Sequence, residues 1–410
     1  MAKNKQKIIQ RSILSIGSSH LTSAMIEWQD GHTPRVVDFQ ESKAISLFRG
    51  QPTSAEKVVE EIKKLTHANG KRKEAYGEVE ILISHSHLKK YEFETSVNFS
   101  PEHDEITEKD IHEVHAQTCR VINTPLNEKV ITEHVQEYTV NDLGGIRNPI
   151  GLAGERIAVK LALFTLPHVL IRQFEKIFER CDIVARSWYP RSLAAGRAIL
   201  SEEQWQGSVL LIYTGSTLTE LIGIENGMVS FYRTILVGIE TVAALMQEAH
   251  PMEAEEALAL TEEYGAFGTR AHGEERIPFR QRAAGESSFV PASDFNRFLH
   301  DGINKISNEL YEGISISLGH FKQVPELLLS GRGVNLGELV EKLEEKCGCR
   351  IKAKGAQDKN IGHYPLFQAP LLGRGIILRE DEEKQNLYRS SIHPLKKVFG
   401  AALEWTREHF

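Results

Sequence analysis

Apolar and polar positions along the chain alternate with the period of strands in some stretches and of helices in others. Residues 12–28 form two β-capable runs separated by Gly-Ser-Ser, a composition typical of a hairpin turn. From Ser54 to Leu65 the apolar residues recur at helical spacing among Glu and Lys, and residues 79–83 (VEILI) follow as a strand. The order predicts the beginning of an α/β domain.

Residues 84–165 have a different, more hydrophilic pattern. Thr107 to Asp110 has the spacing of a capping box and opens a predicted helix over 106–121. Two further strands are expected at 130–140 and 151–164. This stretch is interpreted as a small α+β module inserted into a larger domain.

The opening pattern recurs about two hundred residues later. After a predicted helix at 167–180, a polar stretch at 202–207 is the expected join between two halves. A second hairpin follows, with strands at 208–213 and 218–224, and Asn226-Gly227 then predicts a tight turn.

The last third of the chain is less regular. Residues 265–293 are rich in Gly, Arg, Ala and Ser, which predicts a long loop or a mobile subdomain surface. A long helix is expected at 296–323, and a strand at 326–329 leads into Ser-Gly-Arg-Gly. The charged stretch 379–384 is interpreted as a linker before the end of the chain.

Composition narrows the class of protein. The chain has 410 residues, 41% of them hydrophobic and 26% charged, which suits a globular protein of two or more domains. A net charge of −7 disfavours nucleic acid as a partner. The apolar run after the basic N-terminus is too short for a signal peptide or a spanning helix, so a cytoplasmic protein is expected.

Metal-ligating residue types occur without the spacing of a metal site. Of the four cysteines only Cys347 and Cys349 lie close together, and reduced thiols are expected. Histidines at close spacing lack a matching set of carboxylates; they are His20, His85, His87, His112 and His115. No metal site is predicted.

The two hairpins and the later Gly-rich turn come in the order in which actin-like ATPases place their nucleotide-binding loops. In that fold the hairpin turns offer backbone N–H groups to phosphates, and the Gly-rich turn approaches the adenosine. The nucleotide-binding residues that this resemblance implies are Gly17, Ser18, Ser19, Gly215, Ser216, Thr217, Gly331 and Gly333. The alternative is that these residues only form the turns of the fold and bind no ligand.

A more specific resemblance lies in the insert. Residues 148–156 (NPIGLAGER), preceded by 133–138, are similar to the stretch that FtsA proteins carry in the subdomain peculiar to them. Helix 167–180 also resembles the segment that comes after this stretch in the family. The resemblance runs from about residue 10 to the C-terminus and is most specific over 133–181.

The resemblance implies an α/β, actin-like fold of two lobes with an FtsA-type inserted subdomain and a C-terminal amphipathic helix. The implied parts are lobe 1 (10–83, 166–204 and 376–390), the insert (84–165), the core of lobe 2 (205–237 and 311–375), a smaller subdomain (238–310) and the terminal helix (391–410).

It also implies a cell-division adaptor that polymerises and tethers FtsZ filaments to the cytoplasmic face of the inner membrane at the division site. The implied partners are the FtsZ C-terminal tail, which the 238–310 subdomain would bind, other copies of the chain, inner-membrane lipids and other division proteins.

The expected nucleotide site departs from the family pattern. Actin-like ATPases begin their phosphate loops with carboxylates that organise Mg²⁺, whereas this chain offers Ser15 and Ile212. A lysine of the family is replaced by Thr261, and Arg332 replaces a small residue in the adenosine turn. Hydrolysis and catalytic residues are therefore not expected, and ATP with Mg²⁺ is only an alternative ligand.

The final twenty residues predict an amphipathic helix, with Pro394 where a helix begins. The expected membrane-binding residues are Leu395, Lys396, Lys397, Val398, Phe399, Ala402, Leu403, Trp405 and Phe410. The alternative for this segment is a terminal helix docked on its own chain.

Two other functions remain open. One is a working actin-like ATPase whose carboxylates come from Glu27, Asp38 or Glu220. The other is a pilus-assembly relative of the same superfamily, which also binds a short partner peptide beneath the membrane.

Overall fold

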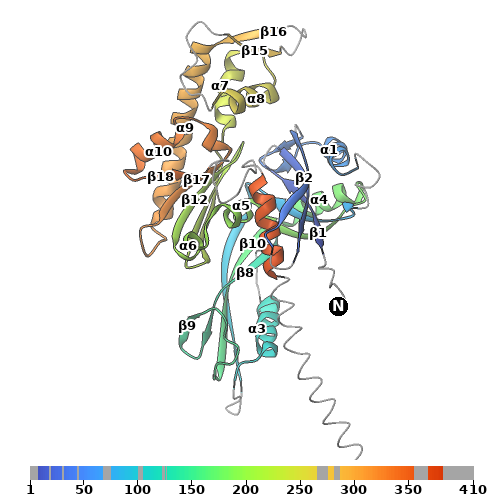
Figure 1. Ribbon diagram of the computed structural model, residues 1–410, viewed down its shortest axis with the longest axis vertical. Helices are drawn as coiled ribbons and strands as arrows, with labels where there is room; N and C mark the ends of the chain where they lie inside the picture. The colour runs from blue at the N-terminus through green and yellow to red at the C-terminus, as the bar shows by residue number, and fades with distance from the viewer. Residues whose placement is uncertain are drawn as a thin grey trace, which may run out of the picture.

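The computed structural model describes residues 8–17, 20–29, 32–43, 46–67, 75–99, 105–121, 125, 127–265, 276–280, 287–354 and 368–381. Within these residues the chain forms two lobes with an elongated domain extending from one of them (Figure 1).

Each lobe is built on a five-stranded sheet, and the two sheets have the same topology. The first has the order β11-β6-β1-β2-β3 and the second the order β14-β13-β12-β17-β18. In both, an antiparallel meander of three strands continues into two parallel strands. The strands are β1 (Ile9–Ile16), β2 (His20–Trp28), β3 (Arg35–Lys43), β6 (Glu78–Ile83) and β11 (Val184–Pro190), then β12 (Ser208–Thr214), β13 (Thr219–Glu225), β14 (Met228–Ile235), β17 (Glu326–Gly331) and β18 (Ile351–Ala353).

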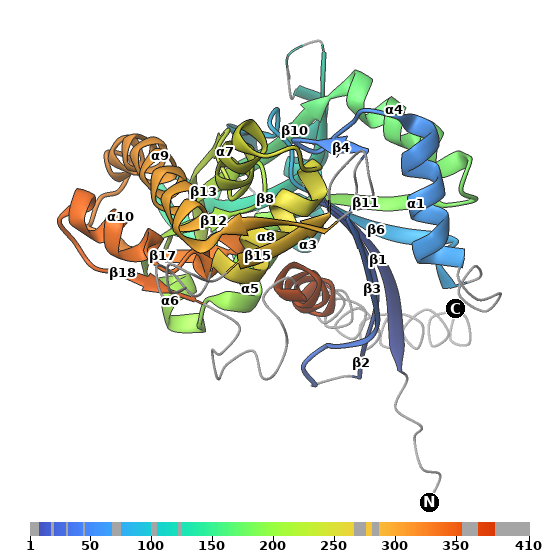
Figure 2. The ribbon, with the colours of Figure 1, turned by 90° about the horizontal axis from the view of Figure 1, so that it is seen from above.

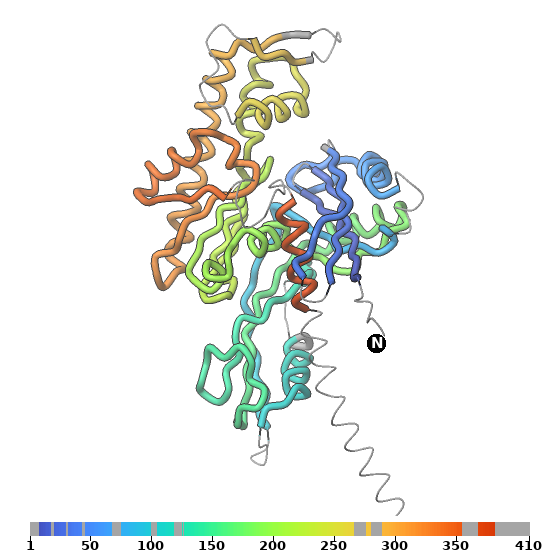
Figure 3. Tube along the Cα trace, viewed as in Figure 1, coloured from blue at the N-terminus to red at the C-terminus, as the bar shows by residue number. Residues whose placement is uncertain are grey.

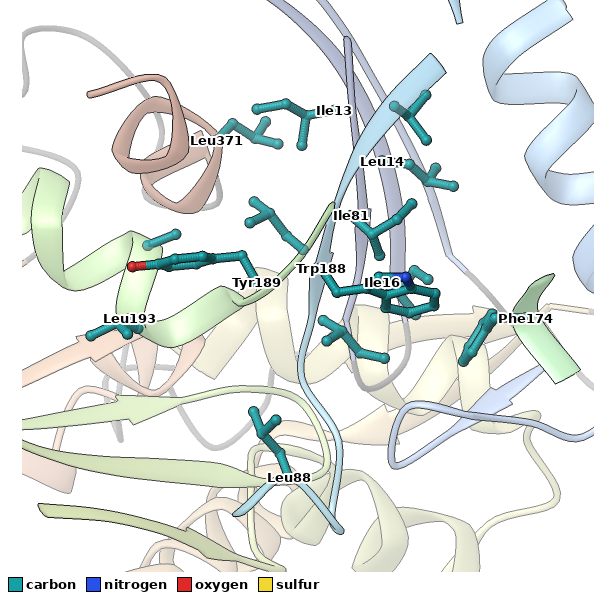
Figure 4. Packing of buried hydrophobic residues seen from close by; sticks show 14 of the residues in the cluster. Ile13, Leu14, Ile16, Ile81, Leu88, Phe174, Trp188, Tyr189, Leu193 and Leu371 are labelled. Atoms are coloured by element: carbon teal, nitrogen blue, oxygen red, sulfur yellow. The ribbon is translucent and has the colours of Figure 1, made fainter. Parts of the chain in front are cut away.

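Helices cover both faces of the first sheet, so its central strands are buried on both sides. Helices α1 (Ala55–His67) and α4 (His168–Glu179) pack against each other, and α5 (Arg191–Ile199) contacts β6 and β11. A further helix over 369–381 brings Leu371 beside Ile13 of β1 (Figure 4). The run 79–83 is apolar except for Glu80, which pairs with Arg374, and a nearly continuous apolar run is what a doubly covered strand requires.

The inserted domain leaves lobe 1 after β6 and returns at α4. Its sheet has the order β7-β10-β8-β9, and α3 (Glu108–Val121) packs against β7 and β10. The four strands are β7 (Lys89–Asn98), β8 (Glu128–Val140), β9 (Leu143–Ile146) and β10 (Arg156–Pro167). A small core of its own, including Val114, Tyr138 and Leu161, holds these elements together.

Helices on the second sheet carry a smaller subdomain. Helix α9 (Ala292–Leu318) runs along the lobe, and α7 (Glu240–Ala249) packs on both α8 (Ala254–Tyr264) and α9 at one end of it (Figure 3). The remaining elements of the lobe are α6 (Glu202–Gln206), the hairpin β15 (Arg276–Arg280) and β16 (Ser287–Pro291), the short helix η2 (Arg332–Asn335) and α10 (Leu339–Cys347). Lobe 1 also has the short strands β4 (Leu47–Phe48) and β5 (Gln51–Pro52).

Most of the predicted elements are present. Both hairpins form, Asp110 accepts hydrogen bonds from the backbone N–H and the hydroxyl of Thr107 at the start of α3, and Asn226 and Gly227 take the positive φ angles of a tight turn.

Two predictions were wrong. Residues 265–293 are not simply a loop, because β15 and β16 pair and bury Ile277 and Val290. Nor is 379–384 entirely a linker, since residues 379–381 end a helix that Arg197 holds through Glu380. In both segments the apolar residues that pack in the folded protein are separated by Gly and charged residues, so their sequence shows no clear strand or helix periodicity. The boundaries expected for the subdomains stay predictions.

The aromatic cluster at α4 and β11 provides a test of this packing. Phe174 is fully buried, with its ring 5.9 Å from Phe178 and 6.0 Å from Trp188. Phe174→Ala is expected to lower the free energy of unfolding by about 3–5 kcal/mol, because it leaves a cavity. Urea unfolding followed by tryptophan fluorescence measures this.

Val169→Ala on the same helix is the control, since Val169 is 77% exposed. It should change the free energy by less than about 0.5 kcal/mol. Equal effects of the two substitutions would contradict the packing described.

Candidate functional site

The two lobes lie side by side when the molecule is seen from above (Figure 2), and contacts of Arg191 place the end of β1 near the second hairpin. The guanidinium of Arg191 lies 3.0 Å from where a Cβ atom of Gly17 would be, and it also lines a pocket formed by the second hairpin. This pocket has a volume of about 60 Å³ and is lined by Arg191, Tyr213, Thr214, Gly215, Gly331, Arg332 and Asn335. We use the term interlobe cleft for this pocket and the adjoining ends of β1 and β12.

The Gly-rich turn after β17 packs against the second hairpin at Thr214. Gly331 has a φ of +83°, and a Cβ atom there would lie 2.4 Å from the Thr214 carbonyl oxygen. Only glycine fits this backbone position. A Cβ atom at Gly333 would likewise lie 2.7 Å from Thr214 Cβ.

Backbone hydrogen bonds from the start of α7 hold the second hairpin turn in place. The carbonyl oxygens of Gly215 and Ser216 accept hydrogen bonds from the N–H groups of Ile239 and Glu240, at 3.3 and 2.8 Å. The side chains of Ser216 and Thr217 are buried. Ser18 and Ser19 lie outside the described residues. A nucleotide-binding role for any of these residues stays a prediction.

The positions expected for metal-organising carboxylates need one correction. Ser15 lies on β1 two residues before Gly17 and is buried. Ile212 does not face the cleft, because it packs in the core of lobe 2, and the neighbouring Tyr213 lines the pocket instead. Side chains of a strand point to alternate faces, so a one-residue error in register exchanges the two. Burial raises the pKa of Tyr213.

The lysine replacement on α8 is also corrected. Thr261 is fully buried, and its hydroxyl donates to the carbonyl of Ala257 at 2.9 Å, so it does not reach the cleft. The next residue, Glu262, does.

Arg332 occupies the expected adenosine turn and ties three parts of the chain together. Its Nη2 atom donates to Glu41 of β3 at 2.8 Å, and its Nη1 atom donates to Glu262 of α8. His20 at the start of β2 lies 3.9 Å from the same Glu262 oxygen. The arginine therefore bridges lobe 1, the core of lobe 2 and the smaller subdomain.

Glu220 forms a second, fully buried tie between the lobes. Its carboxylate accepts a hydrogen bond at 2.8 Å from Ser84, which follows β6, and another from Tyr232 of β14. Burial raises the pKa of Glu220, and the hydrogen bonds oppose this rise.

The other two carboxylates considered as replacements lie away from the turns. Glu27 is near the far end of β2, where it pairs with Arg35. Asp38 pairs in register with Met25, in the middle of the strands. Neither is at the hairpin turn.

Arg191 was not found by sequence analysis. It is the first residue of α5 and is 7% exposed. A charged residue between the apolar stretches 188–190 and 193–195 was the signal available.

The predicted membrane-binding residues, Leu395 to Phe410, lie outside the described residues. Among the described residues, no helix is long and apolar enough to cross a bilayer, and no group of three His, Cys, Asp or Glu side chains could hold a metal ion.

Comparison with known proteins agrees with the two-lobed architecture. A family model described as the SHS2 domain inserted in FTSA matches residues 85–165. The solved PilM-PilN type IV pilus biogenesis complex is similar with a TM-score of 0.58 over 90% of this chain and 98% of that one. At 14% identity this similarity shows the fold alone.

Curated relatives are cell-division proteins. FtsA of Neisseria meningitidis serogroup B is 25% identical over 228 residues, which is 55% of this chain and 54% of that protein. FtsA of Enterococcus hirae is 22% identical over 344 residues, 83% of this chain and 76% of that protein. The chain thus spans about half the length of the Neisseria relative in that match.

The duplicated sheets, the cleft and the insert define an actin-like protein with an inserted SHS2 domain. This confirms the predicted two-lobed, actin-like α/β fold with its inserted subdomain; the C-terminal amphipathic helix stays a prediction. The domain match and the curated relatives together support membership of the FtsA family.

The tie at Arg332 can be measured with a double-mutant cycle of Arg332→Met and Glu41→Gln. Each single change is expected to lower the free energy of unfolding by roughly 1–3 kcal/mol, because a partly buried charge loses its partner. The coupling energy should exceed about 0.5 kcal/mol. The exposed pair of Arg297 and Asp294 serves as the control, with a coupling of at most about 0.5 kcal/mol. Equal coupling in both cycles would contradict a tie between the lobes.

His85, which follows Ser84, makes stability depend on pH. Burial, and to a smaller extent the neighbouring His87, lower its pKa to about 4. The unfolded chain has the ordinary pKa near 6.5 and binds the extra proton between these values. Stability from this group is complete above pH 6.5 and is lost as the pH falls toward 4. At pH 5 the loss should be about 2 kcal/mol.

Urea unfolding at pH 7.5 and 5 measures the effect. The difference between the two pH values should shrink by that amount in His85→Gln. It should not change in His300→Gln, whose side chain is 49% exposed. An unchanged pH dependence in His85→Gln would rule out the buried neutral imidazole as the cause.

Proposed function

We propose that this protein is an FtsA-like adaptor that polymerises into actin-like filaments and tethers FtsZ filaments to the cytoplasmic face of the membrane at the division site. The observation that carries the proposal is the inserted domain. It replaces the direct path from β6 to α4 with a four-stranded sheet and a helix, and its sequence matches the SHS2 domain inserted in FTSA.

In this proposal the adaptor acts by binding its partners and the membrane through its surfaces, without ATP hydrolysis. The strand ends that face the cleft carry Ser15 and Tyr213, so neither supplies a carboxylate to Mg²⁺. Where a nucleotide would contact the late turn, Arg332 is already paired with Glu41 and Glu262. The contacts between the lobes that a nucleotide would make are supplied by side chains.

Membrane attachment is assigned to residues 391–410. Apolar and aromatic residues at helical spacing, including Phe399 and Trp405, would enter the headgroup boundary, with Lys396 and Lys397 near anionic lipid. One such helix binds weakly, but many copies on a filament bind with avidity. Polymerisation and attachment are therefore coupled in this proposal.

Partner binding is assigned to the smaller subdomain of lobe 2, residues 238–310, which would take the FtsZ C-terminal tail. The other candidate is a pilus-assembly role, favoured by the fold similarity to the PilM-PilN complex. Binding of an FtsZ tail peptide, compared with the tail of an inner-membrane pilus-assembly protein, distinguishes the two.

Co-sedimentation with liposomes containing anionic lipid tests the tether. The full chain should pellet with lipid and form filaments visible by electron microscopy, and a chain ending at Arg389 should stay in the supernatant. ATP with Mg²⁺ should change neither result. Phe399→Glu in the full chain should reduce pelleting at least about tenfold, because a charge would enter the apolar interface.

Lys346→Glu, on α10 of the folded body, is the matched control and should pellet like the unaltered chain. Equal pelleting of the full and shortened chains would reject the terminal helix as the anchor. Pelleting that requires ATP would reject the nucleotide-insensitive tether.

A further inference from the structure

A pocket at the edge of lobe 1 lies apart from the interlobe cleft. It has a volume of about 430 Å³, compared with about 60 Å³ for the cleft pocket, and none of its described lining residues lines the cleft pocket. It lies where β1 and β6 begin, and its described lining includes Arg11, Ser12, Met25, Glu78, Glu80 and Arg186. We call it the edge pocket.

Charged groups of both signs line the edge pocket. Glu80 is 5% exposed and pairs with Arg374 at 2.8 Å, so its charge is balanced from within lobe 1. Of the other charged residues in the described lining, Arg11 and Arg186 are positive and Glu78 is negative. The pocket therefore combines an excess of guanidinium groups with one accessible carboxylate.

A β-bulge places Arg186 at this pocket. Arg186 is the extra residue of β11, between two residues that pair in register with β6. Bulges redirect side chains and are common next to binding sites. The Nε atom of Arg186 lies 3.3 Å from a carboxylate oxygen of Glu78, and the two side chains are 49% and 63% exposed. An exposed ion pair contributes little to stability, so a ligand can separate these two groups at small cost.

The last described helix ends beside the edge pocket. A Cβ atom at Gly375 would lie 2.8 Å from Ile26 of β2, which pairs in register with Arg11. Near the end of the helix, Arg379 donates a hydrogen bond at 3.2 Å to the carbonyl of His32, which follows β2. In Figure 1 this helix, in red, lies beside β1 and β2. The chain thus leaves lobe 1 at the end of the sheet that carries the pocket.

The length of the chain beyond this helix limits the distance to the proposed anchor. Ser391, the first residue of the segment assigned to the membrane, is ten residues beyond Asp381, the last described residue. Ten residues span at most about 35 Å. An anchored chain would therefore keep this end of lobe 1 near the lipid headgroups. This step rests on the proposed function.

We propose that the edge pocket binds the zwitterionic headgroup of an aminophospholipid, with the phosphate at Arg186 and Arg11 and the ammonium at Glu78. Guanidinium groups donate paired hydrogen bonds to phosphate oxygens, and a primary ammonium has three N–H donors that a carboxylate can accept. The headgroup replaces one exposed ion pair, between Arg186 and Glu78, by an ion pair with each of them. The pocket gives the adaptor a second membrane contact, and one that selects the headgroup.

Glycerophosphoethanolamine is this headgroup without acyl chains, so it tests the pocket separately from the anchor. Calorimetric titration of the full chain at low ionic strength is expected to show binding. The affinity should be at least about fivefold higher than for glycerophosphocholine, whose trimethylammonium has no N–H to donate, and for glycerophosphoglycerol, which has no amine. No binding at about 50 mM, or equal or tighter binding of either comparison compound, would overturn the proposal.

Two substitutions separate the roles of the charged side chains. Arg186→Gln should lower the affinity for glycerophosphoethanolamine at least about tenfold, because the phosphate loses a charged donor. Glu78→Gln should remove the preference over glycerophosphocholine, because the ammonium loses its carboxylate. Both side chains are exposed, so both variants are expected to fold.

Arg180→Gln is the matched control. Arg180 pairs with Glu56 at 3.5 Å in another exposed ion pair of lobe 1, with side chains that are 50% and 74% exposed. This substitution should leave the affinity unchanged. Unchanged affinity in Arg186→Gln, or an equal loss in Arg180→Gln, would overturn the proposal. A preference that survives in Glu78→Gln would reject the site for the ammonium.

Liposomes test whether the headgroup comes from a membrane. At a constant fraction of anionic lipid, exchanging phosphatidylcholine for phosphatidylethanolamine should increase pelleting of the full chain. Arg186→Gln should remove this increase and leave pelleting with phosphatidylcholine unchanged. Binding of the soluble headgroup without any effect of phosphatidylethanolamine on pelleting would overturn the lipid as the ligand. A full chain that binds the soluble headgroup but pellets with neither kind of liposome would support the pocket and reject membrane attachment.

Discussion

The guanidinium of Arg332 joins three parts of the chain that are distant in sequence. Glu41 comes from the first sheet, Glu262 from the smaller subdomain, and Arg332 itself from the turn that follows β17. Two carboxylates facing each other across a cleft would repel, and one cation between them removes that repulsion. The relation between the lobes is therefore set by charge pairing within the chain, at the place where actin-like ATPases hold a nucleotide.

A second chain of contacts connects the inserted domain to the last described helix. Arg374 pairs with Glu80 of β6 at 2.8 Å and lies over the ring of Tyr189 at 4.7 Å. The Tyr189 hydroxyl is 2.8 Å from His134 of β8, in the insert. The helix also lies close to α5, because a Cβ atom at Gly373 would be 1.7 Å from the Ala194 carbonyl oxygen. These contacts thus join the last described helix to both lobe 1 and the insert.

These contacts favour a protein that acts by holding surfaces in fixed relation. The cleft has a fully buried tie at Glu220 and a partly buried one at Arg332. The cleft also holds positive charge at Arg191, beside the second hairpin turn. A tether does not require its two lobes to open and close in each cycle of ATP hydrolysis, so permanent contacts between the lobes are compatible with this role.

The repeated hairpins, the capped helix of the insert and the Asn226-Gly227 turn could be predicted because local physics decides them: alternation of apolar residues, side-chain capping and positive φ. The resemblance of residues 133–181 then led to the fold class. Tertiary structure decided which side chains face the cleft and which charged residues pair, because neither follows from the local sequence pattern. It turned Tyr213 toward the cleft in place of Ile212, since strand register depends on the partner strand. It paired Arg332 with carboxylates from remote segments, because the energy of a charge depends on what surrounds it in space.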